Sequence, residues 1–141
     1  MSETRSLTGA YLVALTPESA ESIRAKEINL PYLPFRIGRE SRQAIKTAGG
    51  VVGERRKEAP ANNDLYLTEA GERMNVSREH LLIDRDGDEF YLLDRGSTCG
   101  TLVEGEAVGA GRPHRRGLRD HDVIIVGTSF SPFVFKFRLE T

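Results

Sequence analysis

The residues from Leu81 to Leu93 constrain the fold of this chain more than any other stretch. They read LLIDRDGDEFYLL, so two apolar runs flank a short polar centre that contains Asp86-Gly87. Aspartate and glycine both tolerate the positive φ angles that a type I′ turn requires. The segment therefore predicts a tight antiparallel β-hairpin with Asp86-Gly87 as its turn.

Further short strands are predicted on both sides of this hairpin. The segment LVEGEAV, with Glu104-Gly105 at its centre, has the pattern of a second hairpin, and Phe133–Leu139 alternates apolar and mostly polar residues. One short helix is indicated after Thr16-Pro17, because threonine is a typical N-cap and proline a typical first helical residue. Short strands with turn signals and little helix predict an all-β sandwich or barrel. The other predicted strands are Ala10–Leu15, Glu27–Leu30 and Pro34–Gly38.

Size and composition narrow the class of protein. A chain of 141 residues is long enough for one ordinary domain with a real core, and we expect a single domain over residues 1–141 with its core at about 10–140. The net charge of −1 gives no global attraction to nucleic acid or to an anionic membrane. The single cysteine, the lack of a membrane-length apolar run and the polar start of the chain together predict a cytoplasmic protein.

Residues suited to phosphate binding stand at the ends of three predicted strands. Arg39 ends one strand, Ser77 and Arg78 precede the next, and Thr98 lies in a glycine-bounded turn after a third. A guanidinium group, hydroxyl groups and turn amides together replace the hydration of a phosphate dianion. Loops at strand ends are also where an all-β scaffold usually carries its binding residues. The pattern predicts a phosphate site at one end of the sheets.

Five ordered sequence blocks resemble the forkhead-associated (FHA) family. The resemblance spans roughly residues 10–140, and it implies a β-sandwich of two antiparallel or mixed sheets with functional loops at one end. It also implies a non-catalytic module that reads phosphothreonine in a partner protein, which is a serine/threonine protein kinase or its substrate. The blocks are Phe35–Arg39, Asn63–Leu65, Ser77–His80, Asp94–Thr101 and Leu118–Ile124.

The resemblance also implies roles for single residues. It assigns phosphate binding to Arg39, Ser77, Arg78 and Thr98. Contacts to the bound peptide are assigned to Asn75 and to Cys99. Structural roles fall to three residues: Gly38, His80 and Gly100.

Two features depart from the FHA pattern. Cys99 stands where the family usually has asparagine, whose amide resembles a clamp on the peptide backbone, and a thiol is only a weak donor and acceptor. Residues Glu40–Ala61 form a longer connection than usual, rich in glycine and basic residues, and we expect a long polar loop there.

Other functions find less support in the sequence. The three histidines and Cys99 lack metal-ligand spacing, no serine lies in a nucleophile-elbow sequence, and we expect neither a cofactor nor an enzyme. One alternative is a degenerate FHA-like scaffold that binds its partner without phosphate, and Cys99 is the residue that indicates it. A weaker alternative is a nucleic-acid binder that uses Arg55-Arg56-Lys57 and Arg115-Arg116.

Overall fold

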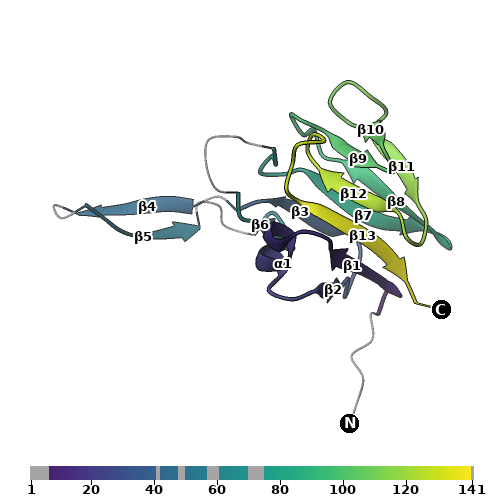
Figure 1. Ribbon diagram of the computed structural model, residues 1–141, viewed down its shortest axis with the longest axis horizontal. Coiled ribbons are helices and arrows are strands. Elements are labelled where there is room, and N and C mark those ends of the chain that lie inside the picture. The colour runs from purple at the N-terminus through teal and green to yellow at the C-terminus, as the bar shows by residue number, and fades with distance from the viewer. Residues whose placement is uncertain (1–6, 41, 48–49, 57–60, 70–74, 141) are drawn as a thin grey trace, which may run out of the picture.

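The computed structural model describes residues 7–40, 42–47, 50–56, 61–69 and 75–140. Its body consists of two β-sheets that pack face to face, with one short helix beside them (Figure 1). This β-sandwich confirms the all-β fold expected from the sequence. No helix in these described ranges is long and apolar enough to cross a membrane.

The larger sheet is antiparallel throughout and has six strands. The predicted hairpin at Glu104-Gly105 joins two of its strands, and both residues take positive φ angles, 50° and 81°, as a type I′ turn requires. In sheet order the strands are β10 (Glu106–Val108), β9 (Thr101–Val103), β12 (Val123–Val126), β13 (Val134–Leu139), β1 (Ala10–Ala14) and β2 (Glu27–Asn29).

The second sheet is mixed and carries the strands that lead to the candidate site. Its third and fourth strands pair antiparallel, whereas the fourth and fifth are parallel. In sheet order the strands are β11 (Arg115–Leu118), β8 (Glu89–Asp94), β7 (Leu81–Asp86), β3 (Phe35–Arg39) and β6 (Leu65–Leu67).

The predicted hairpin of β7 and β8 is present, but its turn lies one residue later than predicted. Asp86 still pairs with Glu89 in the ladder, so the two turn residues are Gly87 and Asp88. Only Gly87 takes a positive φ, at 62°, which excludes the predicted type I′ geometry. The turn shifts because Asp86 continues the strand instead of ending it.

The core lies between the two sheets and is built from alternating residues of their strands. Phe135 and Phe137 of β13 are buried, as the period-two pattern predicted. The ring of Phe137 meets the ring of Phe90 from the opposite sheet, with 5.5 Å between the ring centroids. Aromatic contact across the sandwich thus holds the two layers together.

Helix α1 (Pro17–Ile23) begins where the sequence predicted. The Thr16 side chain accepts a hydrogen bond from the Ser19 amide, and Pro17 occupies the first turn. Ser19 is buried, and its hydroxyl accepts a hydrogen bond from the amide of Val134. These bonds attach the helix to the first residue of β13.

The predicted long loop at Glu40–Ala61 was wrong over most of its length. Strands β4 (Arg42–Thr47) and β5 (Gly50–Arg56) form an antiparallel hairpin with an irregularity between Ile45 and Lys46. In Figure 1 this hairpin extends away from the two packed sheets. Arg115 and Arg116 lie in the edge strand β11.

An ion pair fixes the junction between β3 and β6. The carboxylate of Asp64 accepts hydrogen bonds from the backbone amide and the Nε of Arg36, at 2.8 Å and 2.9 Å, and another from Tyr32. Burial raises the pKa of Asp64, but the bonds from Arg36 and Tyr32 outweigh it and leave that pKa below its ordinary value. The charged carboxylate therefore holds the parallel pair in register.

His80 is a polar residue in the fully buried part of the structure. Its Nδ1 accepts a hydrogen bond from the Ser77 amide at 2.9 Å, so the proton must lie on Nε2, which donates to the carbonyl oxygen of Gly100 at 2.7 Å. Burial lowers the pKa of His80 despite the Gly100 bond. The neutral ring thereby joins the segment before β7 to the turn before β9.

We expect His80→Ala to lower the free energy of unfolding by about 1–3 kcal/mol at pH 7, because the buried Gly100 carbonyl and the partly buried Ser77 amide lose their partner. Urea denaturation measures the difference. His114→Ala is the matched control, since His114 is exposed, and it should unfold like wild type.

His80 also makes the stability of the folded protein depend on pH. The pKa of His80 is lower in the folded than in the unfolded protein. Its contribution to the free energy of unfolding is therefore complete above an unfolded-state pKa of about 6.5 and declines as the pH falls below that value. The stability gap between wild type and His80→Ala should therefore narrow from pH 7 to pH 5. A constant gap over that range would show that His80 does not stay neutral in the folded state.

Candidate functional site

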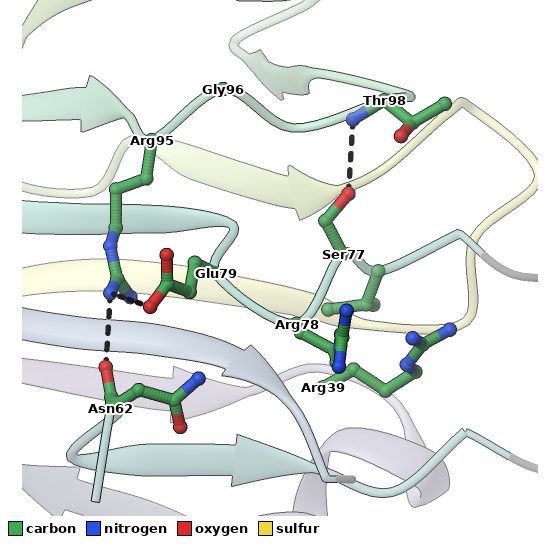
Figure 2. A pocket seen from close by; sticks show the side chains of 9 residues that line it. Arg39, Asn62, Ser77, Arg78, Glu79, Arg95, Gly96 and Thr98 are labelled. Carbon is green, nitrogen blue, oxygen red and sulfur yellow. Dashed lines mark hydrogen bonds and ion pairs between the residues drawn. The ribbon is translucent and has the colours of Figure 1, made fainter. Parts of the chain in front are cut away.

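An open pocket of about 610 Å³ lies at the end of the second sheet. All four residues predicted to bind phosphate line it, although they come from three separate strand ends. Figure 2 shows them with the other lining side chains. The described residues that line the pocket are Arg39, Asn62, Val76, Ser77, Arg78, Glu79, Arg95, Gly96 and Thr98.

Backbone hydrogen bonds place Ser77 at the centre of this group. The amide of Arg39 donates to the Ser77 carbonyl oxygen at 2.9 Å, which joins the end of β3 to the segment before β7. The Ser77 Oγ accepts a hydrogen bond from the Thr98 amide at 3.0 Å, which joins that segment to the turn after β8 (Figure 2). Since Oγ accepts this bond, the hydroxyl hydrogen remains available for donation to a ligand.

Gly38 permits a close approach that positions Arg78. A Cβ atom at residue 38 would lie 2.0 Å from the Arg78 carbonyl oxygen, a distance that no side chain tolerates. The same oxygen accepts a hydrogen bond from the buried side chain of Asn63 at 2.7 Å. Any larger residue at 38 would push the Ser77-Arg78 segment away from β3.

Arg95 and Asn63 are site residues to which the sequence reasoning gave no role. Arg95 donates to the Asn63 side-chain oxygen at 2.6 Å. It also donates to the Asn62 carbonyl at 3.0 Å and pairs with Glu79 at 3.6 Å (Figure 2). Both residues stand inside the blocks that resemble the FHA pattern, which was the available signal. Their function depends on contacts between segments more than thirty residues apart.

The turn that carries Thr98 is fixed from within. The carboxylate of Asp94 accepts hydrogen bonds from the amides of Gly96 and Ser97 at 2.9 Å and 3.0 Å, and also from the Ser97 hydroxyl. The Ser97 Oγ in turn accepts from the Gly100 amide at 3.0 Å. Ser97 is therefore buried in the turn, whereas Thr98 is exposed on the pocket side.

Gly100 ends this turn at a crowded position. It takes a positive φ of 74°, and a Cβ atom there would lie 2.9 Å from the Val108 carbonyl oxygen. Its own carbonyl accepts the bond from His80. Gly38, His80 and Gly100 therefore all lie in close contact with backbone groups of neighbouring segments.

The two residues predicted to contact peptide lie outside the pocket lining. The backbone amide and the side-chain Nδ2 of Asn75 donate to Glu69 at 2.7 Å and 3.0 Å, and the Asn75 Oδ1 accepts from Thr128 at 3.2 Å. Glu69 accepts a further bond from the Val76 amide, so it holds the segment that leads to Ser77. Cys99 is half-buried in the turn between Thr98 and Gly100.

The charges of the pocket favour an anion. Three arginines, Arg39, Arg78 and Arg95, line it together with the single acidic residue Glu79. Within the described parts of the chain, no three histidine, cysteine, aspartate or glutamate side chains gather as a metal site would require. The arrangement of guanidinium, hydroxyl and amide groups suits a phosphate group.

Comparison with solved structures places this fold among FHA domains. The FHA domain of CT664 from Chlamydia trachomatis superimposes with a TM-score of 0.60 at 19% sequence identity, over 94% of this chain and 98% of that one. Mycobacterium tuberculosis EmbR, solved in complex with a low-affinity phosphopeptide, gives a TM-score of 0.58 at 22% identity, over 94% of this chain and 24% of EmbR.

A third structure comes from an analysis of phosphothreonine-dependent FHA domain interactions. It gives a TM-score of 0.54 at 21% identity and covers 94% of this chain and 97% of its own. A comparison with curated protein sequences returned no match. The sequence profile of the FHA domain matches residues 35–127, from the first residue of β3 to the residue after β12. This chain belongs to the FHA domain family.

Proposed function

We propose that this protein binds phosphothreonine-containing segments of other proteins through the pocket described above. The observation that carries the proposal is the convergence of Arg39, Ser77, Arg78 and Thr98 from three strand ends on one pocket. Membership of the FHA family supports it, as do the phosphopeptide complex of EmbR and the phosphothreonine-dependent interactions studied in a related domain.

Each residue has a role in this proposal. The guanidinium of Arg39 pairs with two phosphate oxygens, and the exposed Arg78 adds a second positive charge. The Ser77 hydroxyl donates its hydrogen to a third oxygen, because its Oγ is already oriented by the Thr98 amide. The Thr98 hydroxyl completes the set from the facing turn. Such charge-assisted bonds contribute on the order of 1.5–3 kcal/mol each, so binding depends strongly on phosphorylation.

The pocket needs little rearrangement to bind. His80, Asn63 and the Asp94 turn already hold the backbone around the site by hydrogen bonds. Groups that are fixed before binding lose less conformational entropy when the ligand arrives. This preorganisation suits a binding module, and together with membership of the FHA family it leads us to infer a non-catalytic protein that recruits its partner.

The partner we propose is a phosphothreonine-containing protein, which is a serine/threonine kinase or a substrate of one. Cys99 lies beside Thr98 and contacts the backbone of the bound peptide less strongly than an amide side chain would. The side chain of Asn75 is bonded to Glu69 and Thr128, and its contact with the peptide stays a prediction. Asn75 supports the segment that leads to Ser77.

The second candidate function is binding of a protein partner without phosphate. The observation that favours it is Cys99, at the position where the family usually has asparagine.

A nucleic-acid function through Arg115 and Arg116 has weaker support. Arg115 lies over the ring of Tyr91 with 3.7 Å between its Cζ and the ring centroid, and Arg116 pairs with Glu106 at 2.9 Å. Both guanidinium groups are thus engaged on the protein's own surface.

Replacing Arg39 tests whether binding requires phosphate. Arg39→Ala should weaken binding of a phosphothreonine peptide about thirtyfold or more, because loss of one partner of a buried charge pair costs roughly 2–5 kcal/mol. Isothermal titration with the peptide and its unphosphorylated twin measures this, with Arg85→Ala on the exposed part of β7 as the control. Equal affinity of wild type for the two peptides would exclude phosphate-dependent binding and favour the scaffold.

A pair of serine variants separates ligand contact from folding. Ser77→Ala should reduce phosphopeptide affinity about tenfold and change the melting temperature little, since the Thr98 amide it releases is exposed to water. Ser97→Ala should lower the melting temperature instead, because Ser97 is buried and its hydroxyl is hydrogen-bonded to Asp94 and to the Gly100 amide. Thermal melts and titrations of both variants give the comparison, and the reverse result would mean that Ser77 has no contact with the ligand.

The cysteine that departs from the family pattern offers a gain-of-affinity test. Cys99→Asn should bind a phosphothreonine peptide several-fold more tightly, because a recovered neutral hydrogen bond contributes roughly 0.5–1.5 kcal/mol, and the gain should appear mainly in the dissociation rate. Surface plasmon resonance measures both rates. Cys99→Ser is the control, since it lacks the amide. An unchanged or lower affinity for Cys99→Asn would show that this turn does not contact the peptide backbone.

A further inference from the structure

The β4–β5 hairpin, called the arm below, is rooted on the rim of the candidate phosphate pocket. The chain leaves the sandwich after Arg39 and returns at Asn62, and both residues line that pocket. The amide of Glu40 donates to the Leu67 carbonyl at 2.9 Å, and the amide of Asn62 donates to the Tyr66 hydroxyl at 3.1 Å. Both ends of the arm are therefore fixed to β6, beside the site.

The arm has no partner within the sandwich. Strands β4 and β5 pair only with each other among the described strands, and Figure 1 shows them directed away from the packed sheets. A two-stranded hairpin by itself is marginally stable in water, and both of its outer edges offer unpaired backbone groups. This arrangement is typical of an element that gains stability when it meets another molecule.

The arm is also basic, in a chain that is nearly neutral as a whole. Its two strands contain four basic residues, Arg42, Lys46, Arg55 and Arg56, and one acidic residue, Glu54, which gives a net charge of 4 − 1 = +3. The whole chain carries −1.

The register adds an argument for an anion. Arg42 lies opposite Arg56 in the ladder, and Arg55 lies opposite the neutral Gln43. Like charges at directly opposite positions destabilise an antiparallel pair. An anionic partner would relieve this repulsion, and the Arg42–Arg56 pair is the one nearest to Arg39 in the chain.

The length of the arm matches a short peptide segment. A strand rises about 3.3 Å per residue, so the six residues of β4 span about 20 Å. An extended peptide has nearly the same rise. About six residues of an extended peptide would therefore match the length of β4.

We propose that the arm selects phosphopeptides in which acidic residues flank the phosphothreonine. The inference rests on the proposed function, because the pocket fixes one residue of the peptide and the arm reads its neighbours. Arg42, Arg55 and Arg56 provide the positive charge for aspartate or glutamate side chains. A nucleic acid also carries negative charge, but the attachment of both arm ends to the pocket rim favours a ligand that occupies the pocket and the arm together.

Fluorescence anisotropy with three labelled peptides tests the proposal. One carries phosphothreonine with aspartate and glutamate at the flanking positions, the second carries phosphothreonine with serine and asparagine there, and the third is the acidic peptide without phosphate. Wild type should bind the acidic phosphopeptide about three- to tenfold more tightly than the neutral one, since exposed ion pairs each contribute little. The preference should shrink as the salt concentration rises.

Two triple variants with the same change in net charge complete the experiment. Arg42→Gln/Arg55→Gln/Arg56→Gln should lose the preference and keep its affinity for the neutral phosphopeptide. Lys26→Gln/Arg85→Gln/Arg112→Gln changes exposed residues outside the pocket lining and should keep the preference.

The outcomes separate this inference from the proposed function. Equal affinity of wild type for the two phosphopeptides, or a preference that persists in the arm variant, overturns the role of the arm while phosphate-dependent binding stands. If the phosphate makes no difference to the acidic peptide, the proposed function fails. A duplex oligonucleotide that binds wild type but not the arm variant, at a salt concentration where the peptide preference is absent, assigns the arm to nucleic acid and overturns the proposal.

Discussion

A buried, neutral imidazole is the contact on which the geometry of the site depends. His80 accepts a hydrogen bond from the amide of Ser77 and donates one to the carbonyl of Gly100, so a single ring fixes two loops that lie twenty residues apart in the sequence. Both loops reach the pocket, through Ser77 and Thr98. Because both ring nitrogens are hydrogen-bonded, the ring has one tautomer and one orientation. The buried ring thereby fixes the backbone of the two loops that carry the hydroxyl groups of Ser77 and Thr98.

A second set of contacts fixes the backbone near the arginine residues of the pocket. Asn63 donates to the Arg78 carbonyl and accepts from Arg95, which makes one buried amide the link between the segment before β7 and the turn after β8. Gly38 allows these segments to approach the end of β3. Backbone contacts therefore fix the segments that carry Ser77 and Arg78 at the pocket.

The arm and the sandwich differ in how their strands are held together. The sandwich is held by aromatic packing between its sheets, as in the Phe90–Phe137 contact. Among the described strands, the two strands of the arm pair only with each other, and both ends of the arm are bonded to β6 next to the pocket. In our proposal, the sandwich holds the phosphate site and the arm contacts the neighbouring residues of the peptide.

Local signals in the sequence were sufficient for the strands of the two predicted hairpins, for β1, β2, β3 and β13, for the cap of α1 and for the Glu104-Gly105 turn, because alternation and turn preferences act between residues that are close in the chain. The ordered blocks also identified the family and the residues that meet at the pocket. Tertiary structure decided the rest. Asp86 continues β7 because its pairing with Glu89 extends the ladder, and the expected polar loop contains a hairpin. Asn75 is bonded to Glu69 and Thr128, and Arg95 to Asn63, through contacts that span between six and fifty-three positions. No local pattern encodes such pairs, since they exist only after the sheets have brought distant segments together.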